Sequence, residues 1–381
     1  MDMRTGKMDL LIPSAFGVEG IVKRQLSTLG YNDCKAEDGK VALCGDMSDV
    51  AKLNLYLRSG ERVLIKLSSF TATTFDEVFE NVSSIKWGDY MDSHAKVLVD
   101  VKSVNSVLKA EKAVGGVLKK AIMTSLEKRY GKKLNEDGAR HVVGLSIKND
   151  VATLTLDTTG EGLHKRGYRT LAYTAPLKET LASALIDLTF YDGNRPFADI
   201  FCGSGTIPIE TALKARNIAP GINRNFDFEH FSFVDKKIII DAKEEVKANE
   251  KPSCERIFAY DIDKNAISIA RYHAKLAGVE NDIHFQASDM RNFSSSHPYG
   301  VICSNPPYGE RLSEYKQVAM LYKDLGKLVS SLPNWNAYFL TSFYDFERQY
   351  GKQADKKRKL FNANIECCFY SYFSSKPTKK R

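Results

Sequence analysis

The sequence predicts an α/β protein in which a mixed α+β region precedes a doubly wound, mostly parallel sheet. From about Ala175 onward, short apolar strands and amphipathic helices alternate regularly, as in a parallel sheet with helices on both faces. Before Thr158 the strands and helices follow a mixed order instead. That part ends in two alternating strands separated only by Asn149-Asp150, and polar residues that tolerate positive φ predict a tight hairpin there.

The composition is typical of a globular protein, with 43% hydrophobic and 27% charged residues among 381. No stretch approaches about 18 uncharged apolar residues, and the N-terminus lacks a convincing cleavage site. We therefore expect an untargeted, cytoplasmic protein without a membrane span. Seven cysteines occur without a C-x-x-C pair, which predicts reduced thiols and argues against a metal site.

The net charge of +8 is concentrated at the C-terminal end. Residues 351–381 contain nine Lys or Arg and two Asp or Glu, which amounts to +7 for this segment. A basic end is compatible with a solvated terminus and with contact to a polyanionic partner.

In the first part of the chain, the patterns predict strands at 8–12, 95–103, 142–148 and 151–157, and helices near 17–30, 48–63 and 110–130. Gly30 is expected to end the first helix, and Ser48 to cap the second. In the second part, the patterns predict strands at 196–201, 256–263, 283–289, 299–305 and 337–342, with helices at 178–190, from 208, at 264–278 and at 316–332. A last apolar run covers 365–373, and the boundary between the two parts is expected at 160–176.

A glycine-rich turn, "DIFCGSGT" from Asp199 to Thr206, follows the first strand of the second part. A Walker A loop would need Gly-Lys-Ser/Thr, and the dinucleotide fingerprint would need a glycine at Pro208, so both are excluded. A leading carboxylate before Gly203 and Gly205 suits a ligand with a cationic head group. A glycine turn without a ligand is the alternative.

The next two strands also end on acidic residues. Asp261, followed by Asp263, stands where a carboxylate commonly binds the two hydroxyls of a ribose. Asp289 could accept from an adenine amino group, with Met290 packing nearby. Taken singly, each aspartate is more often a turn former or a helix N-cap, but three acids at successive strand ends share the carboxyl edge of an open α/β sheet, where ligands bind.

The fourth strand ends on "NPPY", Asn305 to Tyr308. Prolines stiffen the corner, so that the Asn305 side-chain oxygen and the Pro306 carbonyl can both accept from one exocyclic amine. Tyr308 offers a ring for stacking on the base that carries the amine. Such a corner suits methyl transfer to an amino group of a flipped base, whereas a proline-stiffened turn is the structural alternative.

Together these motifs resemble those of class I S-adenosylmethionine-dependent methyltransferases that methylate amino groups. "LHKRGYR" (163–169), "APLKETLASAL" (175–185), "NPPYGERL" (305–312) and "IEC" (365–367) narrow the resemblance to bacterial THUMP-domain ribosomal RNA methyltransferases, in particular the large-subunit guanine-N2 enzymes. The resemblance covers nearly the whole chain.

The resemblance implies S-adenosyl-L-methionine as cofactor and RNA as partner. Asn305, Pro306 and Tyr308 would form the target-amine site, whereas the cofactor would be held by Asp199, Phe201, Gly203, Gly205, Asp261, Asp289 and Met290. The start of the helix at 176–181 would close over the cofactor, and Thr180 stands where the family more often has Asn. His164, Arg166 and Arg169 would either link the domains or touch RNA.

The implied domains are a ferredoxin-like subdomain at 1–60, a THUMP RNA-binding domain at 61–160, a linker at 161–176 and a Rossmann-like class I methyltransferase domain at 177–381. Candidate RNA contacts in the THUMP region are Lys102, Lys109, Lys112, Lys119, Lys120, Lys128, Arg129, Lys132 and Lys133.

Three functions follow from these observations. The first is methylation of guanine N2 in large-subunit ribosomal RNA. The second is adenine-N6 methylation of RNA or DNA, which the NPPY corner alone does not distinguish from the first. The third, of another class, is a non-catalytic RNA-binding factor in ribosome assembly.

Overall fold

The computed structural model describes residues 6–171, 177–309, 312–332 and 334–374. Backbone contacts divide the chain into two compact units. The first unit comprises residues 1–14, 26–163 and 224–245, and the second comprises residues 15–25, 164–223 and 246–381. None of the described helices is long and apolar enough to cross a membrane.

The first unit contains a seven-stranded sheet in the order β2-β3-β1-β4-β7-β6-β5. Its strands are β1 (Met8–Pro13), β2 (Lys35–Glu37), β3 (Lys40–Gly45), β4 (Leu64–Thr71), β5 (Lys96–Val104), β6 (Arg140–Lys148) and β7 (Val151–Asp157). Neighbours are antiparallel except β5 and β6, which run parallel. Asn149 and Asp150 adopt φ of 50° and 64°, so the predicted tight hairpin between β6 and β7 is confirmed.

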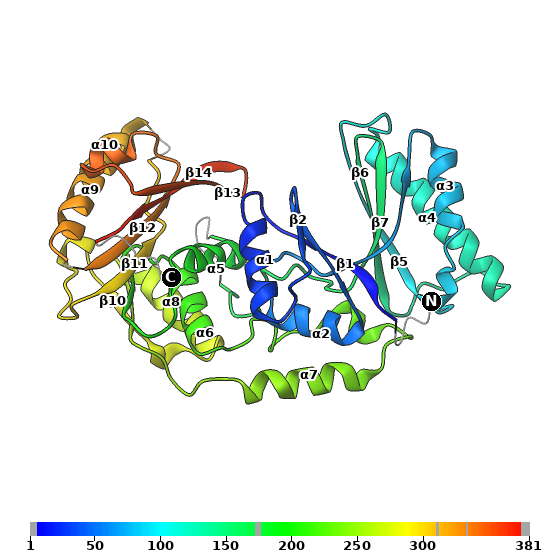
Figure 1. The fold of residues 1–381 in the computed structure, drawn as a ribbon, viewed down its shortest axis with the longest axis horizontal. Helices are drawn as coiled ribbons and strands as arrows, with labels where there is room; N and C mark the ends of the chain where they lie inside the picture. Colours follow the sequence, from blue (N-terminus) through cyan, green and yellow to red (C-terminus); the bar gives the residue numbers. More distant parts are fainter. Residues whose placement is uncertain (1–5, 172–176, 310–311, 333, 375–381) are drawn as a thin grey trace. The chain divides into compact units, whose positions relative to one another are not determined.

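Four helices begin in the first part of the chain: α1 (Glu19–Thr28), α2 (Met47–Tyr56), α3 (Phe75–Ser83) and α4 (Glu111–Tyr130). In Figure 1, α3 and α4 lie side by side against the part of the sheet that contains β5. The predicted cap of α2 was wrong: Asp46, not Ser48, is the N-cap, because its carboxylate accepts from the backbone of Ser48 and Asp49. A carboxylate two residues before the predicted cap therefore satisfies free N–H groups of the first turn.

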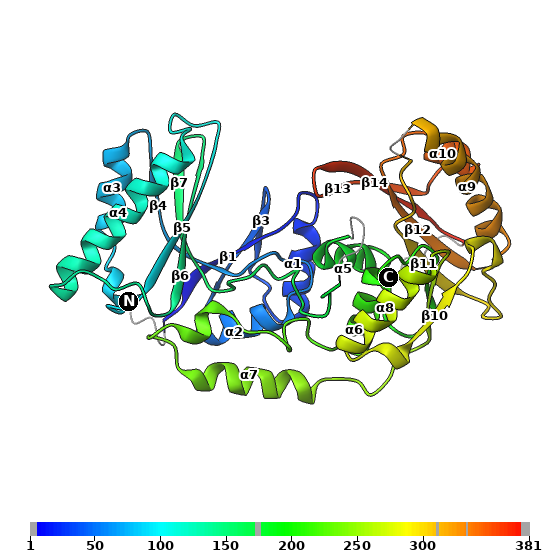
Figure 2. The same ribbon diagram turned by 180° about the vertical axis from the view of Figure 1, so that it is seen from behind.

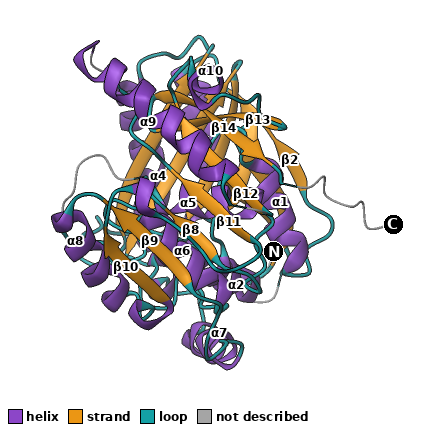
Figure 3. Ribbon diagram, turned by 90° about the vertical axis from the view of Figure 1, so that its left-hand side faces the viewer, coloured by secondary structure: helices purple, strands orange, loops and turns teal. Residues whose placement is uncertain are grey.

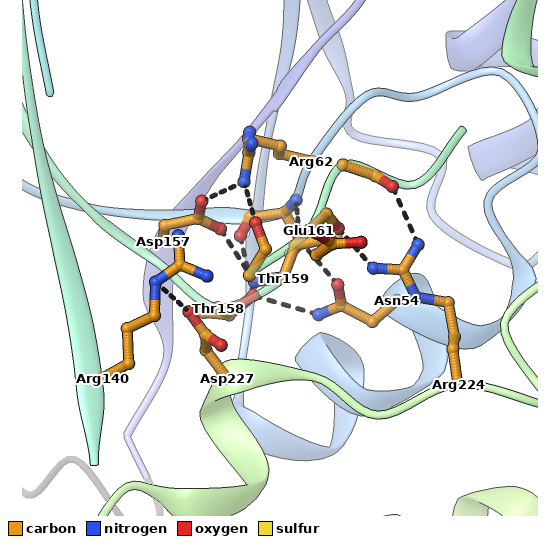
Figure 4. A network of polar contacts seen from close by, with 12 residues as sticks. Asn54, Arg62, Arg140, Asp157, Thr158, Thr159, Glu161, Arg224 and Asp227 are labelled. Atoms are coloured by element: carbon orange, nitrogen blue, oxygen red, sulfur yellow. Dashed lines mark hydrogen bonds and ion pairs between the residues drawn. The ribbon is translucent and has the colours of Figure 1, made fainter. Parts of the chain in front are cut away.

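A later segment of the chain, residues 224–245, belongs to the first unit, and Figure 4 shows two of its residues, Arg224 and Asp227, within a network of polar contacts. Arg224 donates to the carbonyl of Gly162 at 2.8 Å, and the Phe228 amide donates to the carbonyl of Thr158 at 3.1 Å. The ring of Phe231 stacks on His141 with centroids 4.4 Å apart. The return was not predicted from the sequence, although Phe226, Phe228, Phe231 and Phe233 of this segment are all buried.

The second unit contains a sheet in the order β10-β9-β8-β11-β12-β14-β13. Its strands are β8 (Phe197–Asp199), β9 (Ile257–Asp261), β10 (Ile283–Ala287), β11 (Gly300–Ser304), β12 (Trp335–Thr341), β13 (Lys356–Asn362) and β14 (Ile365–Tyr372). The strands are parallel from β10 to β12, whereas β14 is antiparallel to both β12 and β13. This agrees with the predicted doubly wound, mostly parallel sheet.

Sequence analysis missed β13, an edge strand that begins with four exposed basic residues at 356–359. Edge strands commonly carry such charges, and in the sequence they were indistinguishable from the rest of the basic segment. Residues 375–381, the end of that segment, lie outside the described residues.

Helices cover both faces of the second sheet (Figures 1 and 2). α6 (Thr206–Ala215) and α8 (Lys264–Leu276) contact β8, β9 and β10, and α5 (Glu179–Leu188) packs against α6. α9 (Leu312–Ser330) and α10 (Phe346–Tyr350) lie on the opposite face, where a buried core joins Tyr322, Phe339 and Phe346. Figure 3 shows the strands between these helices, and the remaining elements are α7 (Lys236–Ala248), η1 (Trp87–Asp89), η2 (Asp227–His230), η3 (Glu280–Asp282) and η4 (Met290–Asn292).

Candidate active site

A cavity of about 750 Å³ opens at the carboxyl edge of the second sheet. Because β8, β9, β10 and β11 are parallel, the residues that follow them meet at this edge. The lining includes the following residues predicted from the sequence: Asp199, Phe201, Gly203, Asp261, Asp289, Met290, Asn305, Pro306 and Tyr308. Within the described residues, no group of three or more His, Cys, Asp or Glu is arranged to hold a metal ion.

Gly205 is the one predicted site residue that the cavity lining does not include. It caps α6 with a φ of 89°, and a Cβ atom at this position would lie 2.9 Å from the Cβ of Ala270 in α8. The structure thus explains the second glycine of the loop by positive φ and close helix packing.

Asp199 is almost completely buried at the end of β8. Its carboxylate accepts from the Phe201 amide at 3.1 Å, and the Ile200 amide donates to the hydroxyl of Ser304 at 3.0 Å. Burial raises the pKa of Asp199 to about 7; a hydrogen bond from Ser304 opposes this, and repulsion by Asp261 adds to it. A buried carboxylate with so high a pKa is one that a cationic ligand would stabilise in its ionised form.

Asp261 holds the glycine loop. Its two carboxylate oxygens accept from the amides of Gly203 at 2.8 Å and of Asp263 at 2.9 Å. Each oxygen retains acceptor capacity toward the cavity, as required for binding two neighbouring hydroxyls. Asp263 instead caps α8 through the Asn265 amide and does not line the cavity.

Asp289 follows β10 and caps the short turn η4, accepting from the Arg291 amide at 2.8 Å. The same carboxylate forms an ion pair of 2.7 Å with the Arg291 guanidinium. Met290 is buried and contributes an apolar surface beside it. Both the capping and the ligand-facing interpretations of Asp289 therefore have a structural basis.

The NPPY corner leaves β11 at the same edge. The Tyr308 hydroxyl donates to Asn305 Oδ1 at 2.7 Å, and burial raises the pKa of Tyr308, so this hydroxyl remains a donor. The Tyr322 hydroxyl donates to the Pro307 carbonyl at 2.6 Å and lies 2.9 Å from the Thr341 hydroxyl. Glu310 and Arg311, which belong to the same motif, lie outside the described residues.

Several lining residues were not predicted. Ile262 is 72% exposed directly after Asp261, where an apolar residue beside the acid could have been noticed. Asn362 at the end of β13 donates to the Tyr308 hydroxyl at 3.3 Å, and no local pattern indicated it. The other lining residues that were missed are Ile200, Cys202, Ser204, Thr206, Ile207, Pro307, Gly309, Glu314, Leu321 and Ile365, whereas Leu177 belongs to the segment 176–181 that was expected to close over the cofactor.

The basic segment before the sheet is partly internal. Arg166 is buried, with its Nε 3.5 Å from Glu210, so RNA contact by this residue is excluded and that alternative was wrong for it. Arg169 donates to the Leu177 carbonyl at 2.9 Å and lies 3.5 Å from Glu179. These contacts anchor the segment to α5 and α6, whereas residues 172–176 lie outside the described residues.

Comparisons with known families match three parts of the chain. Residues 166–371 match the family described as "RMKL-like, methyltransferase domain". Residues 9–64 match the RlmL ferredoxin-like domain, and residues 72–157 match the THUMP domain. The predicted order of ferredoxin-like, THUMP and Rossmann-like methyltransferase regions is thereby confirmed.

The curated proteins that are similar to this chain include two with informative names. The putative RNA methyltransferase YpsC of Bacillus subtilis is 42% identical, over 98% of both chains. The ribosomal RNA large subunit methyltransferase K/L of Psychromonas ingrahamii is 30% identical over 96% of this chain, which spans only 50% of that relative.

Among the solved structures that resemble the whole chain, two carry descriptions that bear on its chemistry. One is SMU.472, a putative methyltransferase complexed with SAH, at 36% identity and a TM-score of 0.92, covering 97% of this chain and 98% of the other. The second, from Listeria monocytogenes, is described as a predicted N6-adenine-specific DNA methylase, at 42% identity and a TM-score of 0.92 over 97% of both chains.

The buried carboxylate at Asp199, the paired acceptors of Asp261 and the apolar surface of Met290 and Ile262 fit the ammonium, ribose and adenine of S-adenosylmethionine. The predicted cofactor agrees with a methyltransferase match over more than half of the sequence. The chain therefore belongs to the RMKL-like methyltransferase family and is an S-adenosylmethionine-dependent methyltransferase.

Proposed function

We propose that the protein methylates an exocyclic amino group of a base in RNA, namely guanine N2 of large-subunit ribosomal RNA. The observation that carries this proposal is the placement of the NPPY corner. Asn305 and Tyr308 line the same cavity as Asp199 and Asp261, at one edge of one sheet. A target amine and a methyl donor bound there would meet within a single cavity.

The proposed cofactor contacts follow from the acceptors at the strand ends. Asp199 would bind the ammonium group, Asp261 the ribose hydroxyls, and Asp289 with Met290 the adenine. Phe201 and Gly203 would contribute the walls and the bare backbone of the loop, and Gly205 would act through the packing of α6 on α8. S-Adenosylmethionine, when bound, supplies an electrophilic methyl group.

The proposed target contacts use acceptors rather than a base of tuned pKa. Asn305 Oδ1 already accepts one hydrogen bond from Tyr308, and its second lone pair is available for a target amine. The Pro306 carbonyl would accept the second amine hydrogen. Because the Tyr308 hydroxyl is also bound by Asn362, the ring is oriented for stacking before the base arrives.

RNA as the substrate rests on the THUMP match at 72–157 and on relatives named as RNA or ribosomal RNA methyltransferases. Guanine N2 rests on the NPPYGERL extension and its resemblance to the large-subunit enzymes. The basic candidates in the THUMP region are exposed, except Lys119, which is partly buried and pairs with Glu136 at 2.8 Å. We further propose domain bounds of 1–60, 61–160 and 177–381, joined by residues 161–176.

Adenine N6 is the second candidate target. It is favoured by the described activity of the Listeria monocytogenes structure, which matches this chain as closely in fold as the SAH complex does. Adenine and guanine both present an amine beside a ring nitrogen, so Asn305 could hold either.

The proposal is tested by methyl transfer from labelled S-adenosylmethionine to ribosomal RNA isolated from a strain that lacks the gene. Nucleoside analysis of the product should give N2-methylguanosine, whereas N6-methyladenosine would establish the second candidate. Asn305→Ala should abolish transfer while cofactor binding, measured by calorimetry, is retained. Full transfer by that variant would refute the assigned amine site.

A further inference from the structure

A group of three aromatic rings stands at the carboxyl end of β12. Tyr315 from the first turns of α9 stacks on Phe343 with centroids 4.8 Å apart and planes at 28°. Phe343 and Tyr344 are likewise stacked, at 6.0 Å and 18°. Tyr344 is nevertheless 85% exposed, so most of its ring is in contact with solvent.

The three rings, which we call the aromatic platform, are connected to the target-amine corner. Phe343 packs edge-on against Tyr322, with centroids 5.2 Å apart. The Tyr322 hydroxyl in turn donates to the Pro307 carbonyl at 2.6 Å. Because β12 is parallel to β11, residues 342–345 emerge at the same sheet edge as NPPY. The platform therefore continues the target corner outward to the surface of the second unit.

Polar contacts hold the platform in place. The Tyr315 hydroxyl donates to Asp345 Oδ2 at 3.2 Å and lies 3.5 Å from the Tyr344 hydroxyl. Arg348, whose side chain is 81% exposed, lies 3.7 Å from the same carboxylate. Lys316, next to Tyr315, is also exposed. Tyr344 is thus an exposed ring on a buried support with two exposed cations nearby, a combination that single-stranded nucleic acid binds by stacking and phosphate contact.

We propose that the aromatic platform, through Tyr344, stacks on an unpaired base that flanks the target nucleotide. This inference rests on the proposed function, because a base presented to Asn305 must leave its helix and its neighbours lose their stacking partners. A ring at the same edge would replace one of those partners. Stacking on a π-face tolerates any base, so the platform would contribute affinity and positioning rather than sequence preference.

The test uses the full chain and an RNA fragment that the wild-type protein methylates. Tyr344→Ala should weaken RNA binding roughly 5- to 150-fold, the range for loss of one stacked base. Tyr344→Phe keeps the ring and should bind nearly as the wild type does. Tyr299→Ala is the matched control: Tyr299 is 52% exposed but precedes β11, at the opposite edge of the sheet, and its loss should leave binding unchanged.

Binding is measured at several salt concentrations by filter retention. Loss of stacking lowers the affinity of Tyr344→Ala at every concentration and leaves the slope of log K against log salt unchanged, since no phosphate contact is lost. Ultraviolet cross-linking should join the RNA to the peptide that contains Tyr344. Equal RNA affinities of Tyr344→Ala and Tyr299→Ala, or a reduced salt slope for Tyr344→Ala, would overturn the proposal that Tyr344 stacks on a base. Absence of methylation by the wild-type protein would instead overturn the proposed function.

Discussion

Replacing Asp199 with asparagine removes an ionisable group from the second unit at almost constant shape. The pKa of this buried carboxyl is raised from 3.8 to about 7, chiefly by desolvation. The folded protein therefore keeps a proton on Asp199 up to about pH 7, whereas the unfolded chain loses it near pH 4. Between these values the folded state binds more protons, so the free energy of unfolding contributed by this group falls as the pH rises.

The size of the effect follows from the same two pKa values. Above pH 7 the ionised carboxylate costs the fold about 4 kcal/mol, and between about pH 5 and pH 8 the cost grows by about 3 kcal/mol. Asparagine carries no charge at any pH and can still accept from the Phe201 amide. Relative to the wild-type protein, Asp199→Asn should thus gain about 3 kcal/mol of stability on going from pH 5 to pH 8.

The assay is urea unfolding of both proteins at the two pH values, with circular dichroism as the signal. Subtracting the two free energies of unfolding at each pH cancels the contributions of all other titrating groups. Cofactor binding by Asp199→Asn should change in the opposite direction. At pH 8 its affinity should be roughly 10- to 100-fold lower than that of the wild type, because the hydrogen bond between a charged carboxylate and the cofactor ammonium is lost. Asp263→Asn, outside the cavity, is the control and should bind the cofactor normally. A stability difference between Asp199→Asn and wild type that does not change with pH would refute the buried, protonated carboxyl.

Three further substitutions test other parts of the second unit. Gly205→Ala combines a positive φ with a close helix contact and should lower stability by about 1–3 kcal/mol in urea unfolding; an unchanged midpoint would contradict the packing role. Arg166→Ala removes the ion pair of the buried Glu210 and should cost about 3 kcal/mol by the same assay; an unchanged midpoint would show that the pair does not stabilise the fold. Asn362→Ala removes a donor to Tyr308 and should lower kcat about fivefold with normal cofactor affinity by calorimetry; a parallel loss of cofactor binding would mean a different role.

Local chemistry was sufficient for much of the fold. The hairpin at Asn149-Asp150 was predictable because positive φ is a property of two residues and their immediate backbone. The cap of α2 was misplaced by two residues because Asp46 and Ser48 are both good capping side chains, and the backbone path selects between them. β13 was missed because an edge strand needs little apolar surface. Its first four residues are all basic, and they show no alternation of apolar and polar side chains.

The sequence by itself determined which carboxylates and which corner come together, since motifs at the ends of parallel strands meet at one edge of the sheet. Only the tertiary structure decided which of them line the cavity and what completes it. Gly205 packs against α8 and does not line the cavity. Asn362, at the end of β13, lines the cavity and donates to the hydroxyl of Tyr308, although it follows Tyr308 by 54 residues. The exposed ring of Tyr344 beside Tyr315 is likewise a product of how α9 packs on the sheet. Contacts between distant residues depend on the path of the backbone, which no local pattern of residues specifies.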